Sequence, residues 1–296
     1  MRQIAFSLVY LRGVSPKRYF PNAARDLCCR RKGATPMNTT GNTILITGGG
    51  SGIGRGLAEA FHKLRNQVII AGRRREVLDA VTGANPGMKS AAFDMQNLGE
   101  LPGFAAGIAR QYPSLNVLIN NAGIMKAENL QEQAESFATA EAIVTTNLLA
   151  PMRLTAALLP VLKKQNRATI MTVSSGLAFM PMAMTPTYCA TKAAIHSYSQ
   201  SLRYQLKNTK IEVLELVPPY VATELMGTHQ AKDPRAMPLA QYIAEVMEIL
   251  ETQPDAKEIC VERVYPLRFS AEQGQAKHEE MFDGFNASMA SAAAEQ

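Results

Sequence analysis

The 296-residue sequence is poor in cysteine and contains no long apolar run. Its cysteines are Cys28, Cys29, Cys189 and Cys260. They form no C-x-x-C motif and no cluster with histidine, so their spacing indicates neither a zinc site nor a disulfide framework, which favours a reducing, cytoplasmic location. The apolar run Leu154–Leu162 has about half of the roughly 18 residues that a membrane span needs, and it contains Pro160. We therefore expect no bound metal and no membrane-spanning segment.

Acidic residues are scarce in one part of the chain only. Residues 1–36 carry eight Lys or Arg residues and one acid, whereas the remainder carries 23 basic and 24 acidic residues. A nearly neutral body gives no electrostatic reason to expect a nucleic acid as partner. The basic stretch is typical of an organellar transit segment, although such segments are usually richer in serine, and it also fits an extension upstream of a start at Met37. Under either interpretation, residues 1–36 are expected to be disordered and to lie outside the fold.

From Asn42 onward, short apolar runs alternate with segments of helical periodicity. The runs predicted to be strands are Ile44–Ile46, Val68–Ala71, Ala91–Phe93, Val117–Ile119, Ile170–Val173, Val213–Val217 and Ile259–Val261. Segments long enough for crossover helices lie between them, including 103–112, 135–163 and 188–207. Apolar strands separated by helices predict an α/β protein with a doubly wound parallel sheet, the Rossmann fold, covered on both faces.

Composition also predicts the domain boundaries. Residues 37–285 are expected to form a single Rossmann-type domain. Within it, the polar and proline-interrupted region 226–256 is interpreted as an insertion over the active site, and the Ala- and Ser-rich residues 286–296 as a flexible tail. Ligands of such sheets bind at the carboxyl ends of the strands, so we look for binding residues there.

The first predicted strand runs directly into TGGGSGIG, residues 47–54, which opens a helix. Glycines permit a tight turn and let backbone N–H groups approach a pyrophosphate, which the positive end of the following helix also attracts. The strand–turn–helix context distinguishes this run from an ordinary glycine-rich loop and predicts a dinucleotide site. The cofactor-binding residues expected in it are Gly48, Gly50, Ser51, Gly52, Ile53 and Gly54.

The end of the second predicted strand indicates which dinucleotide binds. NAD-binding folds usually place an acid there for the ribose 2′-hydroxyl, but this sequence has Arg73, Arg74 and Arg75. The guanidinium groups of Arg73 and Arg74 match the oxygens of a 2′-phosphate, so we expect NADP(H) rather than NAD(H). The alternative is that these arginines belong to a solvated helix start, in which case an NAD-specific dehydrogenase is predicted.

Tyr188 and Lys192 stand four residues apart in a segment with helical character, so their side chains share one face of the helix. A free phenol has a pKa of about 10, and a neighbouring ammonium group favours the phenolate. The pair is therefore a candidate general acid/base. A Tyr-x-x-x-Lys spacing is common by chance, and its surroundings are what make it specific.

Further motifs accompany this pair in a fixed order. They are TGGGSGIG, Asp94, Asn120-Asn121-Ala122-Gly123, Asn147, Ser175 thirteen residues before Tyr188, and YCATK. With these motifs in this order and spacing, residues 42–226 strongly resemble the short-chain dehydrogenase/reductase family. The resemblance implies an oxidoreductase that moves a hydride between a nicotinamide cofactor and a small-molecule carbonyl or alcohol. Relatives of this kind are commonly homodimers or homotetramers.

The resemblance also implies roles for individual residues. Tyr188 would exchange a proton with the substrate oxygen, while Lys192 would lower the tyrosine pKa and hold the nicotinamide ribose. Ser175 would hydrogen-bond the substrate oxygen and stabilise the charge that develops on it. Asn147 would help to position a water that connects Lys192 to solvent.

The cofactor contacts carry over with one departure. Asp94 would contact the adenine, and Asn121, Ala122 and Gly123 would lie beside a ribose. After the sixth predicted strand the family usually has Pro-Gly and then a threonine that binds the nicotinamide carboxamide. Here Pro219 replaces the glycine, which fixes φ and removes a donor. Thr223 stays in register, so Val221 and Thr223 are expected to keep the cofactor contact.

The double proline, Glu224-Leu225 and the region 263–285 resemble more narrowly the uncharacterised oxidoreductase branch of bacterial D-alanylation operons, which names no substrate. Methionines on the loops where substrate would enter favour a hydrophobic small molecule, although packing beneath a lid explains them equally well. They are Met125, Met180, Met182, Met184 and Met226. The alternative function is a cofactor-binding regulatory or scaffold protein, which would have no use for the four residues implied in catalysis.

Overall fold

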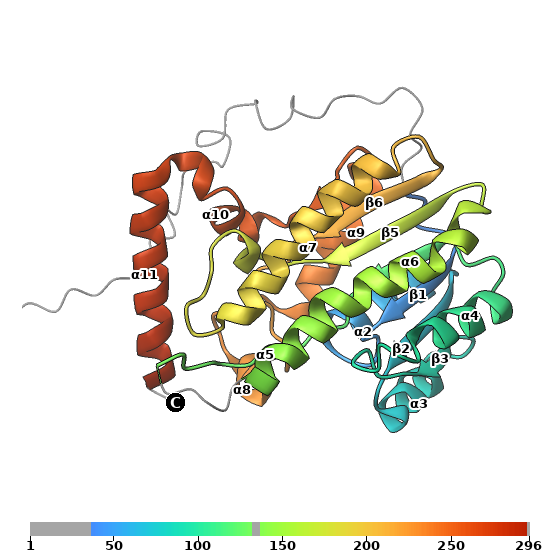
Figure 1. Cartoon of the computed structure of the whole chain (residues 1–296), viewed down its shortest axis with the longest axis horizontal. Coiled ribbons are helices and arrows are strands. Elements are labelled where there is room, and N and C mark those ends of the chain that lie inside the picture. The colour runs from blue at the N-terminus through green and yellow to red at the C-terminus, as the bar shows by residue number, and fades with distance from the viewer. Residues whose placement is uncertain (1–36, 132–136, 295–296) are drawn as a thin grey trace, which may run out of the picture. The chain divides into compact units, whose positions relative to one another are not determined.

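The computed structural model describes residues 37–131 and 137–294, so the expected extension over 1–36 lies outside the described residues. Seven parallel strands form one sheet in the order β3-β2-β1-β4-β5-β6-β7 (Figure 1). The strands are β1 (Thr43–Thr47), β2 (Gln67–Gly72), β3 (Lys89–Ala92), β4 (Val117–Asn120), β5 (Ala168–Val173), β6 (Ile211–Leu216) and β7 (Glu258–Ile259). The predicted doubly wound parallel sheet is confirmed, and every predicted strand overlaps an observed one.

Helices cover both faces of the sheet. One layer contains α2 (Gly52–Lys63), α3 (Arg75–Ala84) and α9 (Leu239–Thr252), and the other contains α4 (Leu101–Gln111), α6 (Ala150–Lys163) and α7 (Pro186–Gln205). Successive side chains of a strand point to opposite faces. Accordingly, Ile44 and Ile46 of β1 join the first apolar cluster, and Leu45 joins the second. This two-sided burial is why the strands are continuous apolar runs rather than alternating ones.

The strand order reverses at β1, which has β2 and β3 on one side and β4 to β7 on the other. The register pairs Ile46 of β1 with Ile70 of β2 and with Ile119 of β4, so the three strands end at a similar level. The connections after β1 and β4 lead to opposite faces of the sheet. A crevice therefore forms at the carboxyl ends of the central strands, where ligands of such folds bind.

The predicted helix over 135–163 is divided. In the described residues it consists of α5 (Phe137–Val144), a π-helical turn η2 (Thr145–Leu149) and α6. Contrary to our expectation, Phe137–Lys163 taken together is long and apolar enough to cross a membrane by length and composition, a test that core helices of soluble proteins also pass. Leu154 and Leu158 of α6 are completely buried in the cluster between the sheet and α4.

The region 226–256 differs from the predicted insertion over the active site. It contains the short helix α8 (Thr228–Lys232) and all of α9. Tyr242 and Val246 of α9 are fully buried in the cluster that α9 shares with α2. Since α9 connects β6 to β7 across one face of the sheet, this part of the region is a crossover helix of the core. The prolines that suggested an insertion flank the helix.

The C-terminal segment also differs from the prediction of a flexible tail. After the short helix α10 (Tyr265–Arg268), helix α11 spans Gln275–Ala294 and includes most of residues 286–296. Alanine has the highest intrinsic helix propensity, which outweighs the serines of this segment. Phe285 and Met289 additionally pack against buried side chains of the domain.

Candidate active site

A pocket of about 450 Å³ opens at the carboxyl ends of the central strands. The predicted residues that line it are Gly48, Gly50, Ser51, Gly52, Ile53, Arg73, Arg74, Asp94, Asn121, Ala122, Gly123, Ser175, Tyr188, Lys192, Val221 and Thr223. Gly54 and Asn147 do not line the pocket themselves. They lie against two residues that do, Gly48 and Gly123 respectively. The structure therefore gathers the predicted cofactor-binding and catalytic residues around one cavity.

The turn between β1 and α2 requires glycine at specific positions. Gly48 has a φ of +67°, and a Cβ there would stand 2.9 Å from the Cα of Ala122. A Cβ on Gly54 would stand 2.3 Å from the carbonyl oxygen of Gly48. The first turn of α2 holds no acidic side chain, and Ser51 at its N-cap makes no side-chain cap. The backbone N–H groups at this helix start are therefore free to bind an anionic group.

Gly54→Ala is expected to lower the free energy of unfolding by about 1–3 kcal/mol and to weaken dinucleotide binding, because backbone would have to move to admit the methyl group. Gly107→Ala in α4 is the control, since a Cβ there meets nothing within 4 Å. That change should stabilise the protein by roughly 0.5–1 kcal/mol. Urea denaturation and a cofactor titration measure both effects, and equal stabilities of the two variants would contradict the close packing of the turn.

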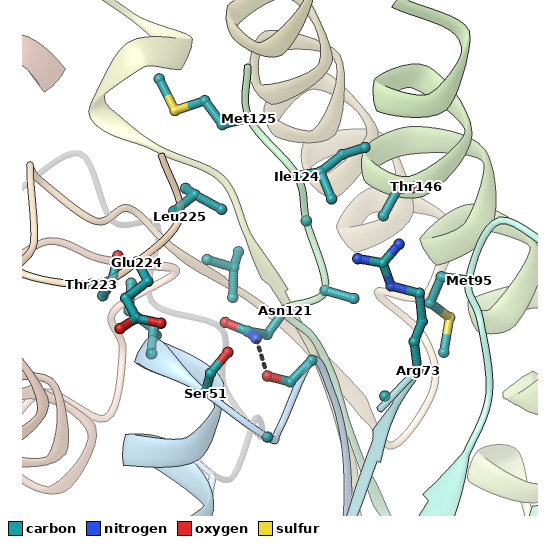
Figure 2. A pocket seen from close by; sticks show the side chains of 18 of the residues that line it. Ser51, Arg73, Met95, Asn121, Ile124, Met125, Thr146, Thr223, Glu224 and Leu225 are labelled. Carbon is teal, nitrogen blue, oxygen red and sulfur yellow. Dashed lines mark hydrogen bonds between the residues drawn. The ribbon is translucent and has the colours of Figure 1, made fainter. Parts of the chain in front are cut away.

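Asn121 and Thr47 hold the glycine turn against the end of β4. The Asn121 Nδ2 donates to the carbonyl oxygens of Thr47 (3.0 Å) and Gly48 (3.3 Å). Figure 2 shows Asn121 and a hydrogen bond that it makes at the floor of the pocket. In return, the Thr47 Oγ1 accepts the N–H groups of Asn121 (3.0 Å) and Ala122 (3.1 Å). The Asn121 amide, predicted to lie beside a ribose, thus also fixes the shape of the turn.

The arginines that follow β2 stand at one side of the pocket. Arg73 and Arg74 are exposed, and within residues 37–131 and 137–294 neither forms an ion pair. Figure 2 shows Arg73 beside Met95, across the pocket from Ser51. Two guanidinium groups without a protein anion are consistent with an anionic ligand group at this end of the pocket.

Two further polar groups line this part of the pocket. Asp94 follows β3, and its carboxylate accepts the N–H of Gln96 at 2.9 Å. Thr146 belongs to η2 and is 6% exposed, and its Oγ1 has no hydrogen-bond partner in the described protein. A buried hydroxyl without a partner is rare and costs free energy, so Thr146 points to a polar ligand group in the cavity.

The double proline after β6 leaves Thr223 in the predicted place. A Cβ on Gly52 would lie 3.4 Å from the Thr223 methyl group, so the threonine faces the glycine turn. Gln230 of α8, which is 5% exposed, donates to the carbonyl oxygen of Val221 (2.9 Å) and to the Thr223 Oγ1 (3.2 Å). Gln230 therefore positions this loop. Sequence reasoning missed it, because a polar residue in a polar region gives no signal of burial.

Ser175, Tyr188 and Lys192 meet at the end of β5. They are 7%, 6% and 5% exposed, respectively. Ser175 is hydrogen-bonded to the Tyr188 phenol, and the Lys192 Nζ lies 5.4 Å from the centre of the tyrosine ring. The Lys192 Nζ also donates to the carbonyl oxygen of Val173 at 2.8 Å. The predicted sharing of one helix face therefore brings the phenol, the ammonium group and the hydroxyl together.

Burial dominates the electrostatics of this group. It raises the pKa of Tyr188, and the hydrogen bond with Ser175 acts in the opposite direction. The prediction of a lowered phenol pKa is therefore wrong for the protein alone, because burial disfavours the phenolate more than the hydrogen bond with Ser175 favours it. Burial also lowers the pKa of Lys192 to about 8, opposed by the negative charge of Glu215. At neutral pH the site thus combines a protonated phenol with a cationic lysine.

Asn147 links two sides of the site from within η2. Its Oδ1 accepts the N–H of Ile124 (2.9 Å), and its Nδ2 donates to the carbonyl oxygen of Ile124 (2.9 Å) and to the Thr191 Oγ1 (3.3 Å). The side chain therefore joins the loop after β4 to α7 directly beside Lys192. Single π-helical turns occur frequently at functional sites. The water-positioning role of Asn147 stays a prediction.

Glu215 is a residue near the site that the sequence did not indicate. It is completely buried, although carboxylates seldom are, and its oxygens lie 3.0 and 3.1 Å from the His196 Nδ1. His196 follows Lys192 by one turn of α7. Glu258 completes a cluster with metal-ligand spacing, but its carboxylate is paired with Arg268 at 2.6 Å. An acid inside the apolar run Val213–Val217 was the signal that could have identified Glu215.

The glycine turn, the arginines and the cluster around Tyr188 line one cavity at the carboxyl ends of the strands of a doubly wound α/β protein. The family model of short-chain dehydrogenases matches residues 42–234. The chain therefore belongs to the short-chain dehydrogenase family, and it is an oxidoreductase of the kind that uses a nicotinamide cofactor and acts on CH–OH and C=O groups.

Relatives of known sequence support this assignment. The chain is 38% identical to the uncharacterized oxidoreductase DltE of Bacillus subtilis (strain 168), over 84% of this chain and 98% of that protein. The predicted resemblance to the D-alanylation branch is thereby confirmed. The NADP-dependent 3-hydroxy acid dehydrogenase of Schizosaccharomyces pombe is 29% identical, over 80% of this chain and 96% of that protein.

Solved structures share the fold. A short-chain dehydrogenase from Streptomyces avermitilis superposes with a TM-score of 0.71 at 24% identity, covering 86% of this chain and 100% of that one. A short chain dehydrogenase from Burkholderia cenocepacia J2315 in complex with NADP gives a TM-score of 0.70 at 24% identity, covering 83% and 99%.

Proposed function

We propose that the protein is an NADP(H)-dependent oxidoreductase that transfers a hydride between nicotinamide and a small-molecule carbonyl or alcohol. Tyr188 acts as general acid/base, assisted by Lys192, Ser175 and Asn147. The observation that carries the proposal is that Ser175, Tyr188 and Lys192 line the same cavity as the glycine turn and Arg73. A protein that only binds a cofactor has no use for a buried phenol and ammonium group at that place.

The residues that line the pocket support a dinucleotide with a 2′-phosphate as the ligand. The glycine turn and the start of α2 would hold the pyrophosphate, and Arg73 and Arg74 would bind the 2′-phosphate. Thr223 would contact the carboxamide, and Lys192 the ribose next to it. The unpaired hydroxyl of Thr146 supports a polar ligand group in the same cavity. When bound, the nicotinamide supplies the hydride chemistry.

The side chains around Tyr188 would control the proton. Ser175 would donate a hydrogen bond to the substrate oxygen, and Tyr188 would give its proton to that oxygen as negative charge develops there. The raised pKa keeps the phenol protonated at neutral pH, which suits the direction of carbonyl reduction. The Lys192 ammonium would stabilise the phenolate that remains. Asn147 would hold the loop after β4 against α7 during these steps.

Glu215→Gln is expected to move the alkaline limb of the pH–rate profile to lower pH. Burial lowers the pKa of Lys192 to about 8, and the charge of Glu215 opposes this effect. An uncharged side chain of the same shape removes the opposition, so Lys192 would lose its proton at a lower pH. The measurement is kcat/KM across the pH range, with Glu212→Gln on the same strand as control. If the alkaline limb lay at the same pH in both variants and in the wild type, the charge of Glu215 would not affect the pKa of Lys192.

The proposed function is tested by a cofactor titration followed by a substrate screen. NADPH is expected to bind roughly 10- to 100-fold more tightly than NADH. With NADPH, at least one substrate in a panel of aldehydes, ketones and alcohols should be turned over in a Tyr188-dependent manner. Binding without any such turnover would instead support a regulatory or scaffold protein. A preference for NADH would support an NAD-specific dehydrogenase.

A further inference from the structure

Helix α11 lies along the substrate side of the site. Figure 1 shows it in red beyond the carboxyl ends of the strands, beside the loop between β5 and α7. Most of its described side chains are exposed, and the partly buried ones recur at helical spacing. They are His278, Met281, Phe282, Phe285, Asn286 and Met289. This stripe is the face of α11 that contacts the domain.

Phe285 and Met289 from this stripe pack against an apolar cluster that contains Tyr188. We call its members the methionine cluster: Met125, Ile143, Met182, Tyr188 and Cys189, surrounded by Ile124, Leu177, Met184 and Met226. No member carries a charge at neutral pH. Met125 and Ile124 also line the pocket together with Ser175 and Tyr188. Through Met125 and Ile124, the methionine cluster therefore forms part of the cavity wall beside the phenol.

Asn286 attaches α11 to the same wall. Its Oδ1 accepts the N–H of Ala183 at 2.6 Å, and its Nδ2 donates to the carbonyl oxygen of Pro181 at 3.1 Å. These two residues flank Met182, a buried member of the methionine cluster. One side-chain amide thus fixes the position of α11 and the position of Met182 together.

The attachment of α11 to the domain depends on its side chains. Gly274 precedes the helix with a φ of +94°, a backbone conformation that glycine adopts readily, and a Cβ there would meet nothing within 4 Å. The backbone at the start of α11 is therefore free of close contacts at this position. In the described part of the chain, no backbone hydrogen bond joins α11 to the domain beyond its first turn. Only side-chain contacts hold the helix over the methionine cluster, and such contacts can be released without unfolding it.

We propose that α11 is a lid over the reaction site and that Phe285 and Met289 determine its specificity, selecting carbonyl substrates with an apolar chain or ring next to the reacting carbon. The inference rests on the proposed function, because it assigns the space beside Tyr188 to the substrate. A chain that lies against the methionine cluster leaves water on closure. Each buried methylene then raises kcat/KM about fourfold.

The first test measures specificity in the full-length protein. The substrates are 2-butanone, 2-hexanone and 2-octanone with NADPH, and the lid variant is Phe285→Ala/Met289→Ala. The control is Asp283→Ala/Ser288→Ala, which truncates two exposed side chains of α11 that lie outside the stripe and outside the methionine cluster. In the wild type and the control, kcat/KM should rise about fourfold per methylene. In the lid variant most of this rise should be lost.

The second test measures lid opening without turnover. Cys189 is 3% exposed within the methionine cluster, so its alkylation by N-ethylmaleimide, followed by peptide mass spectrometry, reports opening. The lid variant and Asn286→Ala should react roughly tenfold faster than the wild type, and the control should not. Unchanged labelling, or equal chain-length dependence in all proteins, would overturn the lid. If only short or charged carbonyl compounds were turned over, the proposal of apolar substrates would be wrong. If NADPH oxidation did not depend on Tyr188, the proposed function itself would be wrong.

Discussion

Tyr188→Phe is expected to retain NADPH binding and to lose about 10²- to 10⁴-fold in kcat, the usual contribution of a general acid. The substitution removes one oxygen from a ring that is otherwise buried in apolar surroundings, so the fold should be unaffected. Without the phenolic proton, negative charge on the substrate oxygen has no proton donor. Stopped-flow or steady-state absorbance of the reduced nicotinamide measures the loss, and cofactor fluorescence measures the retained binding.

Tyr204→Phe provides the matched control for this variant. Tyr204 lies near the end of the same helix, α7, and is 68% exposed. Its substitution should leave kcat and cofactor affinity unchanged. Comparable activity of the two variants would show that the Tyr188 hydroxyl has no part in the reaction.

Arg73→Asp is expected to weaken NADPH binding roughly 10- to 150-fold while leaving NADH binding nearly unchanged or improved. Hydrogen bonds from a guanidinium group to a phosphate are charge-assisted, and a carboxylate in the same place repels the 2′-phosphate. The same carboxylate is suited to the 2′-hydroxyl of NADH. Parallel titrations with both cofactors give the change in preference.

Arg75→Asp separates a specific contact from a change in net charge. Arg75 is an exposed neighbour at the start of α3 and does not line the pocket. It should shift NADPH binding far less than Arg73→Asp does. An equal shift in both variants would mean that the arginines act through the general field of the helix start rather than by contact.

The elements around the cofactor pocket could be predicted because each depends on local chemistry. A strand covered on both faces is mostly apolar, so the apolar runs of β1 and β5 were visible in the sequence. The turn before α2 leaves no room for a Cβ atom at Gly48 or Gly54, so only glycine fits there, and these glycines marked the start of the helix in the sequence. Likewise, a spacing of four residues on a helix placed Tyr188 and Lys192 on one face without any knowledge of the tertiary structure.

The features that could not be predicted depend on contacts distant in sequence. Residues 286–296, most of which belong to α11, appeared to be a flexible tail because the methionine cluster that the helix contacts lies far earlier in the sequence. The bond between Asn286 and Ala183, 103 residues apart, illustrates this distance. Glu215 was hidden in an apolar strand, since its pairing with His196 exists only after α7 packs on β6. The direction of the Tyr188 pKa shift was wrong for the same reason. Sequence spacing identifies a nearby cation but not the depth of burial.

The structure also reconciles two explanations of the loop methionines. A hydrophobic substrate and packing beneath a lid were alternatives in the sequence, yet Met125 lines the pocket and Met182 belongs to the cluster against which Phe285 and Met289 of α11 pack. Both uses involve one continuous apolar surface, so a lid built on these residues would itself form part of the substrate site.

Transfer of deuterium tests the central claim most directly. With NADPH deuterated at the transferred position of its nicotinamide and a ketone substrate, the wild-type protein should place the label on the carbinol carbon of the alcohol product, as read by mass spectrometry. Tyr188→Phe, at a saturating concentration of the same cofactor, should form almost no labelled alcohol. Labelled alcohol formed by the variant at the wild-type rate, or cofactor oxidation by the wild type without labelled alcohol, would contradict a reaction in which this phenol supplies the proton.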